Sequence, residues 1–486
     1  MSDASALRGR AVRGAAWSLA DKWGVRLASL LTFAILARLL EPEQFGLVAA
    51  AQIVVMVLQT ISNQGIVQAL IVSKPVTDRT LATATVIAVI TSILTVAAIA
   101  SVAKPLGELF GQDDFVPVVS ALAGTLIVQA AGAVPTAELQ RQMEFKRLAQ
   151  RSVISALLSG IAGVAAALAG WGVWALVTQA FTQVVVATVL AWVAARLRPR
   201  LGWNGADARR LMRFAGPVMI ADVVAVAIAQ GDNLVVGAVL GSVALGYYTV
   251  AFRLLNVVVD VFTGAVSAVA LPVFAQLSEN LVRSRNAYLR VTQLSFAAAT
   301  PVFIGLAVVA PLAIEVTFGP QWDRSVPVFQ VLCGAGVAMA ALYFDRPVLL
   351  AAGMAKLELT ISVVLAAATV GAALIGAQYG LVATAACVTA RMYLTWPLRF
   401  LAVRRAISIS LREYIVNLRG VAAAATAQGV VSVALLQVND GAWCVLAAGV
   451  GTMAYVVTLW MTDRSLIRSG LSVLGDLRPA SRRPTG

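Results

Sequence analysis

Long apolar runs separated by short polar segments fill almost the whole chain. Each run is long enough to cross a bilayer as a helix, which takes about 20 residues. The pattern therefore predicts an all-α integral membrane protein with fourteen transmembrane helices. The predicted spans are residues 14–38, 46–71, 81–103, 115–137, 151–169, 172–195, 214–238, 244–275, 291–317, 326–344, 358–376, 379–402, 415–436 and 442–463.

The basic residues are distributed unevenly between the predicted loops. Most of the 37 Lys and Arg residues fall in the N-terminal segment, in every second loop and in the C-terminal tail. Because cytoplasmic loops carry an excess of Lys and Arg, both termini are predicted to be cytoplasmic. The same loops account for the formal net charge of +14, since basic loops face anionic membrane lipids. No nucleic-acid partner is therefore predicted.

The composition narrows the chemistry further. Hydrophobic residues make up 60% of the chain and charged residues 12%, and the spans leave no room for an appended catalytic domain. Histidine is absent, which excludes histidine-based metal sites and proton relays, so any proton coupling must use carboxylates. The three cysteines lie in apolar runs without a second Cys or His at ligand spacing. Neither a metal site nor a cofactor is predicted.

The chain repeats itself at an offset of about 200 to 210 residues. Residues 39–46 resemble residues 239–246, and Gly172 corresponds to Gly380. Since the repeated unit has six spans, an even number, the two copies should have the same orientation and enclose a central cavity. The predicted domains are an N-lobe at 1–212, a C-lobe at 213–405, and two further helices with a cytoplasmic tail at 406–486.

Three of the arginines inside predicted spans are candidates for binding a substrate. Arg26 and Arg391 are central in the first and twelfth spans, and Arg253 is shallower in the eighth. A charge near the bilayer centre costs about 2.5 to 3.5 kcal/mol, so such residues normally face a partner or a water-filled cavity. Unbalanced arginines favour an anionic ligand, because the guanidinium fork matches phosphate oxygens. Arg253 could instead snorkel, or form a buried ion pair with Asp232 or Asp260.

Other polar residues follow the same helices. Arg253, Asn256 and Asp260 share one face of the eighth span, because their spacing matches two helical turns. A second stripe on the second span is predicted to face them across the cavity. The residues assigned to the polar cavity lining are Gln52, Gln59, Asn63 and Asn256. The candidates for ion coupling are Asp260, Asp232 and Asp222, with Asp260 preferred because it shares a face with Arg253.

Short motifs spread over nearly the whole chain carry a resemblance to a known family. They are the stretch 38–46, Gly231-Asp232-Asn233, Leu245-Gly246-Tyr247-Tyr248, Leu271-Pro272-Val273-Phe274, and Phe318-Gly319 with Trp322. These motifs resemble those of Wzx-like polysaccharide repeat-unit flippases, of the multidrug, oligosaccharidyl-lipid and polysaccharide exporter superfamily.

The resemblance implies a multi-pass protein of the bacterial cytoplasmic membrane that works by alternating access. Its substrate would be an oligosaccharide on undecaprenyl diphosphate, moved from the cytoplasmic to the periplasmic leaflet. Arg26, Arg253 and Arg391 would then bind the diphosphate. A proton or a sodium ion would be the coupling ion, and the polymerase and glycosyltransferases of the same pathway would be partners.

Two other functions stay open at the level of sequence. A cation-coupled drug or small-molecule exporter of the same superfamily would favour a cavity of carboxylates and aromatics, whereas this chain has at least as many embedded arginines. A membrane glycosyltransferase or polymerase would need a catalytic constellation. The only acidic pair in the outward loops, Asp113-Asp114, is interpreted as a solvated turn, so the chain is not predicted to be an enzyme.

Overall fold

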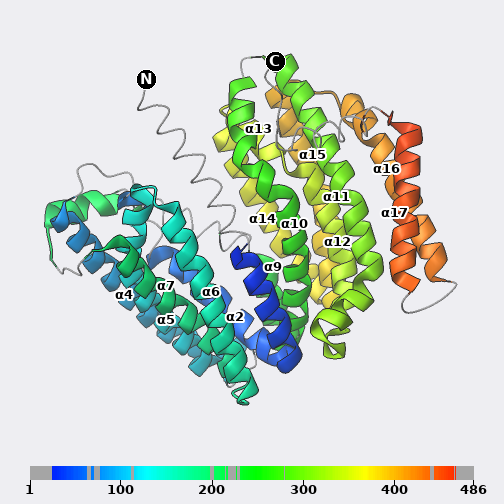
Figure 1. Ribbon diagram of the computed structural model, residues 1–486. Coiled ribbons are helices and arrows are strands. Elements are labelled where there is room, and N and C mark those ends of the chain that lie inside the picture. Colours follow the sequence, from blue (N-terminus) through cyan, green and yellow to red (C-terminus); the bar gives the residue numbers. More distant parts are fainter. Residues whose placement is uncertain are drawn as a thin grey trace, which may run out of the picture. The chain divides into compact units, whose positions relative to one another are not determined.

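The computed structural model describes most of the chain, and nearly all of the described residues are helical (Figure 1). They are residues 24–62, 67–70, 77–110, 114–197, 202–213, 215–216, 226, 230–277, 280–437, 443–464 and 466. Within them, eleven helical segments are long and apolar enough to cross a membrane. The prediction of an all-α membrane protein is therefore confirmed. The count of fourteen spans stays a prediction, because most of the span 214–238 lies outside the described residues.

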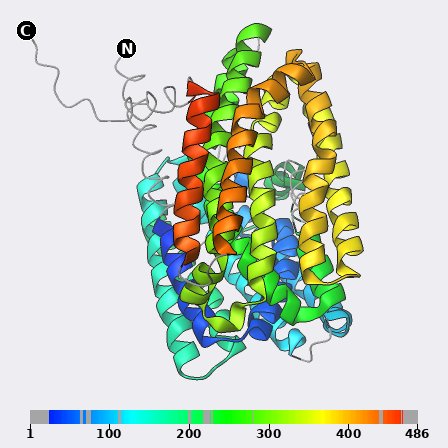
Figure 2. The same cartoon turned by 90° about the vertical axis from the view of Figure 1, so that its right-hand side faces the viewer.

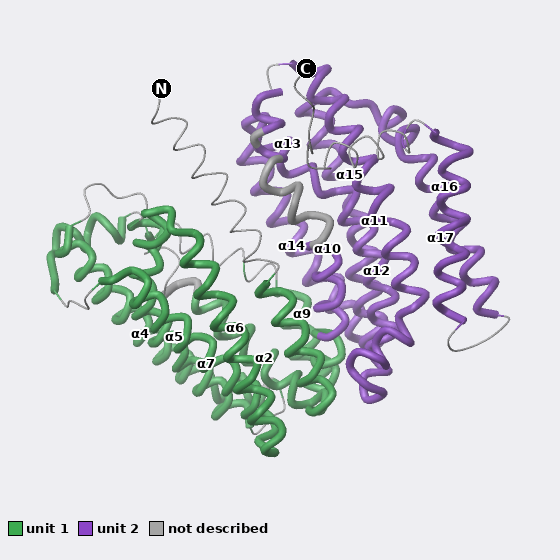
Figure 3. The backbone as a smooth tube through the Cα atoms, viewed as in Figure 1, with its two compact units in different colours: residues 1–249 green, residues 250–486 purple. Residues whose placement is uncertain are grey.

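The chain divides into two compact units, residues 1–249 and residues 250–486 (Figure 3). It passes from the first to the second inside helix α10 (Gly241–Leu277). Each unit has its own buried apolar clusters. The lobes expected at 1–212 and 213–405 stay a prediction.

Unit 1 is built mainly from long apolar helices, with two short helical elements near its end. They are the helical residues 24–39, α2 (Pro42–Ser62), α4 (Asp78–Phe110), α5 (Phe115–Arg141), α6 (Phe145–Leu168), α7 (Val173–Ala195), α9 (Gly231–Val235), the π-helix η1 (Val236–Leu240) and the start of α10. Helices α6 and α7 pack side by side, and α5 packs against both α4 and α7. Small side chains such as Ala84, Ala88 and Ala130 fill one buried cluster. Residues of this size let helix backbones approach closely in a membrane.

The described residues of unit 2 form the rest of α10 and eight further elements. They are α11 (Leu281–Phe318), the 3-10 helix η2 (Pro320–Trp322), α12 (Ser325–Leu342), α13 (Asp345–Ala351), α14 (Ala355–Ala377), α15 (Leu381–Ile407), α16 (Leu411–Leu436) and α17 (Trp443–Thr462). The last two helices run side by side along α11, as the orange and red ribbons of Figure 2 show. Other close pairs are α11 with α12 and α14 with α15.

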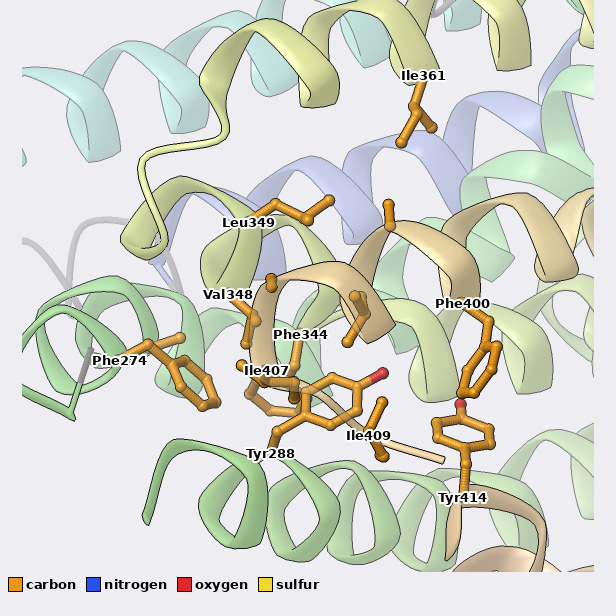
Figure 4. Packing of buried hydrophobic residues seen from close by; sticks show 14 of the residues in the cluster. Phe274, Tyr288, Phe344, Val348, Leu349, Ile361, Phe400, Ile407, Ile409 and Tyr414 are labelled. Atoms are coloured by element: carbon orange, nitrogen blue, oxygen red, sulfur yellow. The ribbon is translucent and has the colours of Figure 1, made fainter. Parts of the chain in front are cut away.

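An aromatic cluster forms much of the core at one end of unit 2 (Figure 4). Phe274 of α10 packs edge-on against Phe344, and Tyr288 of α11 stacks on Tyr414 of α16. Phe400 of α15 lies edge-on to Tyr414. Offset and edge-to-face contacts of this kind add to the burial of the rings. The cluster therefore joins the ends of α10, α11, α15 and α16 into one packed layer.

Local geometry in unit 2 follows that in unit 1. Helix α6 begins just after Met143, with φ of 57°, and α14 begins just after Gly353, with φ of 74°. Helices α7 and α15 both end on a left-handed residue, Arg196 and Ser408, each with φ of 53°. These features recur in the order and at the spacing of the sequence repeat.

The short loop predicted between the spans 214–238 and 244–275 corresponds to the turn at Gly241, where η1 ends and α10 begins. Gly241 has φ of 84° and ψ of 176°, a conformation that residues with a Cβ atom rarely adopt. The glycine therefore ends η1 and allows the chain to enter α10 in a new direction.

Candidate functional site

A polar stripe runs along α2 in unit 1. Gln52, Met56 and Gln59 are spaced to share one helical face, and Gln52 and Met56 are exposed. Gln59 is half-buried, and its side-chain amide donates a hydrogen bond to Oε1 of Gln129 on α5. The Gln230 amide lies 3.6 Å from the Met56 sulfur. Asn63, which was assigned to the same stripe, lies outside the described residues.

Asp232 on α9 is a buried carboxylate with several donors. Its side chain accepts hydrogen bonds from the Tyr248 hydroxyl at 3.1 Å and from the Asn233 backbone N–H at 2.9 Å. Tyr248 is fully buried in the first turns of α10, so this bond ties α9 to α10 within unit 1. The Asn233 amide also donates to Gln230 at 3.0 Å. These contacts give Asp232 a structural role in holding the two helices together.

The charged stripe on α10 belongs to unit 2. Arg253 and Asp260 are half-buried and Asn256 is exposed, and their spacing places all three on one face of a continuous helix. The helix itself is as the sequence predicted, and the roles of these three residues stay predictions. Asp222, the third coupling candidate, lies outside the described residues.

The two other predicted arginines are also on helices. Arg26 is half-buried on the helical residues 24–39. Arg391 is half-buried on α15, about 15 Å along the helix from its first residue at a rise of about 1.5 Å per residue. Its position in the middle of a 27-residue helix agrees with the central position predicted from the sequence. A common ligand for the three guanidinium groups stays a prediction.

Some polar residues that make contacts between helices or are buried carried no signal in the sequence pattern. Gln129 appears as an isolated polar residue in an apolar run, and Asp345 and Glu358 fall at the ends of predicted spans, where charges are ordinary. In the structure Asp345 is 1% exposed and Glu358 is 4% exposed. Packing of helix ends against one another, which hydropathy does not register, buries them.

The groups in these stripes are suited to binding. Amides and guanidinium groups donate hydrogen bonds to hydroxyl and phosphate oxygens, and they are poor nucleophiles at neutral pH. In the described part of the chain, no three Cys, Asp or Glu side chains gather as a metal-binding group would require. The arrangement can therefore bind a polar or anionic ligand through hydrogen bonds and charge.

Comparisons with known sequences point to proteins of polysaccharide biosynthesis. Residues 35–327 match the sequence profile of a family described as "Polysaccharide biosynthesis protein". The chain is similar to the succinoglycan biosynthesis transport protein ExoT of Rhizobium meliloti (strain 1021), with 28% identity over 479 residues that cover 96% of each chain. It is also similar to the lipopolysaccharide biosynthesis protein WzxC of Escherichia coli (strain K12), with 22% identity over 334 residues that cover 68% of each chain.

The fold is similar to that of a solved membrane protein. Superposition on the lipid II flippase MurJ in an inward closed conformation gives a TM-score of 0.74. The match covers 93% of this chain and 99% of that chain at 13% sequence identity. At this identity the likeness concerns the fold alone.

Proposed function

Because its residues 35–327 match the family profile, the chain belongs to the polysaccharide biosynthesis protein family, and we propose that it is a lipid-linked oligosaccharide flippase. The predicted resemblance to Wzx-like flippases is confirmed by this match and by the curated relatives. The proposed substrate is an oligosaccharide repeat unit on undecaprenyl diphosphate. It moves from the cytoplasmic to the periplasmic leaflet of the bacterial inner membrane by alternating access.

The family match over more than half of the chain is the observation that carries this proposal. Two relatives are named for succinoglycan biosynthesis transport and for lipopolysaccharide biosynthesis, and these names support the proposal. Transport without catalysis also suits the chemistry of the stripes, whose amides and guanidinium groups bind without forming covalent bonds. Glycosyltransferases that supply the repeat unit and a polymerase that consumes it are the proposed pathway partners.

The embedded arginines would recognise the part of the substrate that every repeat unit shares. Arg26, Arg253 and Arg391 can each give two parallel N–H bonds to a phosphate, which a lysine cannot do. Amides such as Gln52 and Asn256, both exposed, can donate to and accept from sugar hydroxyls. The diphosphate would thus provide most of the affinity, and the amides would tolerate different sugars.

Coupling to an ion gradient is part of the proposal. Asp260 lies on the same helical face as Arg253, so its ionisation changes the charge presented on that face of α10. A proton taken up by Asp260 in one state and released in the other would drive the cycle in one direction. A sodium ion at the same carboxylate is the alternative coupling ion.

A drug or small-molecule exporter of the same superfamily is the second candidate function. A fold shared across the superfamily does not separate the two, because function depends on the site rather than on the fold. The exposed amides and embedded arginines favour an anionic, hydroxylated substrate over the cationic, aromatic compounds that carboxylate-rich cavities bind.

Transport in proteoliposomes tests the proposal directly. Purified protein would be reconstituted with a fluorescent undecaprenyl-diphosphate oligosaccharide, and the fraction accessible to a membrane-impermeant reducing agent would be followed. Translocation much faster than in protein-free liposomes is expected. Translocation at the protein-free rate, together with export of a cationic dye by the same preparation, would favour the drug exporter instead.

A further inference from the structure

Two buried carboxyl groups lie in the aromatic cluster of unit 2, away from the stripes described above. Asp345 is the first residue of α13, and Glu358 is in the first turn of α14. Phe274, Phe344 and Val348 are among the apolar side chains that enclose this region (Figure 4). Burying a carboxylate without compensation is costly, so the surroundings of each group decide its charge.

Asp345 has a tyrosine as its hydrogen-bond partner. The hydroxyl of Tyr288, which is 1% exposed, donates to Oδ1 of Asp345 at 2.7 Å. Tyr414 stacks on Tyr288 with ring centroids 6.3 Å apart and an interplanar angle of 30°. The Tyr414 hydroxyl is buried as well. Asp345 therefore lies next to a pair of buried tyrosines.

Glu358 has the cation of the cluster as its partner. Arg399 Nη1 on α15 lies 3.5 Å from Oε2 of Glu358, and the Ser362 hydroxyl donates to Oε1 at 3.1 Å. Arg399 and Glu358 also act electrostatically on Asp345, with opposite signs. The described residues that form the cluster thus combine two carboxyl groups with one guanidinium group.

Neighbouring charges do not change this balance. The side chain of Arg346 is exposed although it follows Asp345 directly. Arg285 of α11 pairs with Glu413 of α16 at 3.5 Å, and both side chains are partly exposed. Helix α10 contributes Ala270 and Phe274, which carry no charge. One carboxyl group in excess therefore remains in an apolar enclosure, where the neutral form is favoured over an unpaired ion.

We propose that Asp345 is a proton-binding site, with Tyr288 as its hydrogen-bond partner and Arg399 as the cation that responds to its charge. Oδ1 receives the Tyr288 hydrogen bond, so Oδ2 is the atom that carries the proton. Loss of the proton adds a negative charge that acts on Arg399, which is then attracted by two carboxylates instead of one. Asp345 would be a second proton-binding residue besides Asp260, and its link to transport rests on the proposed function.

A proton suits the site better than a metal cation. Sodium and calcium ions need several oxygen ligands, and the Tyr288 hydroxyl uses its hydrogen on Asp345. Arg399 also lies beside the second carboxylate and repels a cation there. The arrangement of one donor, one acceptor and a nearby guanidinium is that of a titrating acid.

Exchange of a proton at Asp345 would change how helices pack. Helix α13 has seven residues and lies between α12 and α14, and it contacts α15. An ionised Asp345 would draw Arg399 away from Glu358, because both carboxylates attract the same guanidinium group. The proton would thus control the contact between α13 and α15 within unit 2.

Infrared spectroscopy of the purified full-length protein tests the proton site without any transport assay. Spectra would be recorded over a pH series, and the C=O stretch of protonated carboxyl groups would be followed. Wild type is expected to show a band that disappears as the pH rises and that is missing in Asp345→Asn. Tyr288→Phe should keep the band and move its midpoint to higher pH, because the carboxylate loses a donor.

A matched control is the buried carboxylate Glu138 of unit 1, which is 7% exposed. It accepts hydrogen bonds from Arg141 at 2.9 and 3.0 Å and is therefore compensated by its own cation. Glu138→Gln should leave the titrating band unchanged. The same band in wild type and in Asp345→Asn at every pH would overturn the proposal.

Transport assays then test the link to function. In proteoliposomes, Asp345→Asn should lose the stimulation by a pH gradient that wild type and Glu138→Gln keep. Full stimulation in Asp345→Asn would overturn the link to transport. If wild type moves no lipid-linked oligosaccharide, the proposed function fails, while the infrared result still decides whether Asp345 binds a proton.

Discussion

Gly46 of α2 and Gly246 of α10 place the starts of these two helices in backbone contact. A Cβ atom on Gly46 would overlap the carbonyl group of Ser242, and one on Gly246 would overlap the carbonyl oxygen of Pro42. Both glycines close the repeated motifs at 39–46 and 239–246. Equivalent positions of the sequence repeat therefore meet each other, with glycine on both sides, within unit 1.

Replacing Gly46 or Gly246 by alanine should destabilise the protein. The added methyl group would overlap backbone atoms of the neighbouring helix, so one of the two helices must shift. Overpacking of this kind costs about 1–3 kcal/mol. Thermal unfolding in detergent would measure the loss. Gly371→Ala on α14 is the matched control, because a methyl group added there would meet no neighbouring atom within 4 Å. Equal melting temperatures for Gly46→Ala and Gly371→Ala would contradict the close contact.

The bond between Tyr248 and Asp232 should contribute to stability. Tyr248→Phe removes a donor from a buried carboxylate, which typically costs about 1–3 kcal/mol. Asp232→Asn removes the charge that needs the donor, so the double variant should lose less than the sum of the single losses. The unfolding free energies of wild type, the two single variants and the double variant together give the coupling energy between the two side chains. Strictly additive losses would show that the two side chains do not interact.

Hydropathy predicted the helices well and their ends less well. The span predicted at 291–317 is α11, which starts at Leu281, and the span predicted at 81–103 is α4, which continues to Phe110. Charged residues such as Arg285 end an apolar run but are good helix formers, so the helix extends beyond the apolar run. The side chain of Asn280 then caps α11 by accepting from the Arg283 N–H.

Contacts between helices could not be read from the sequence. Spacing placed Gln52 and Gln59 on one face of α2, because helical periodicity is a local property. Nothing in that periodicity pairs Gln59 with Gln129, or Tyr288 with Asp345, since each partner lies on another helix. A charge such as Asp345 at the end of a span is normal and gives no sign of burial. Only the packing of α13 shows that it is buried.

The predicted topology can be tested by cysteine labelling. Ser242 is unsuitable as a periplasmic position because it is 3% exposed, whereas Tyr379, in the turn before α15, is 78% exposed. Trp203, which is 63% exposed, represents the linker predicted to be cytoplasmic. After replacement of the three native cysteines, an impermeant maleimide should label Tyr379→Cys and not Trp203→Cys in intact cells. Labelling of both or of neither would contradict the fourteen-span topology.

Arg391 should show whether a bidentate guanidinium is needed for transport. Arg391→Lys keeps the charge but loses the fork, so it should reduce transport less than Arg391→Ala and still measurably. Initial rates in proteoliposomes at matched protein amounts would separate the three proteins. Arg405→Ala, at the exposed end of the same helix, is the control and should transport normally. Normal rates for both Arg391→Ala and Arg26→Ala would rule out the cationic site.

Asp260 should be required for coupling but not for substrate binding. Asparagine mimics the protonated carboxyl group, so Asp260→Asn should bind substrate and exchange it across the membrane. Because it cannot release a proton, it should lose the acceleration by a pH gradient. Proteoliposomes assayed with and without a gradient would measure this, with the exposed Asp114→Asn as the control.

Comparison with sodium separates the two coupling ions. If the gradient accelerates Asp260→Asn as much as wild type, Asp260 is not the coupling residue. If wild type requires sodium and ignores the pH gradient, a proton cannot be the coupling ion, and the carboxylate on this face of α10 would serve a metal ion instead. We expect the pH gradient to accelerate transport by wild type and by Asp114→Asn but not by Asp260→Asn. Only the first two proteins retain an Asp260 carboxyl group that can change the charge on the face of α10 that carries Arg253.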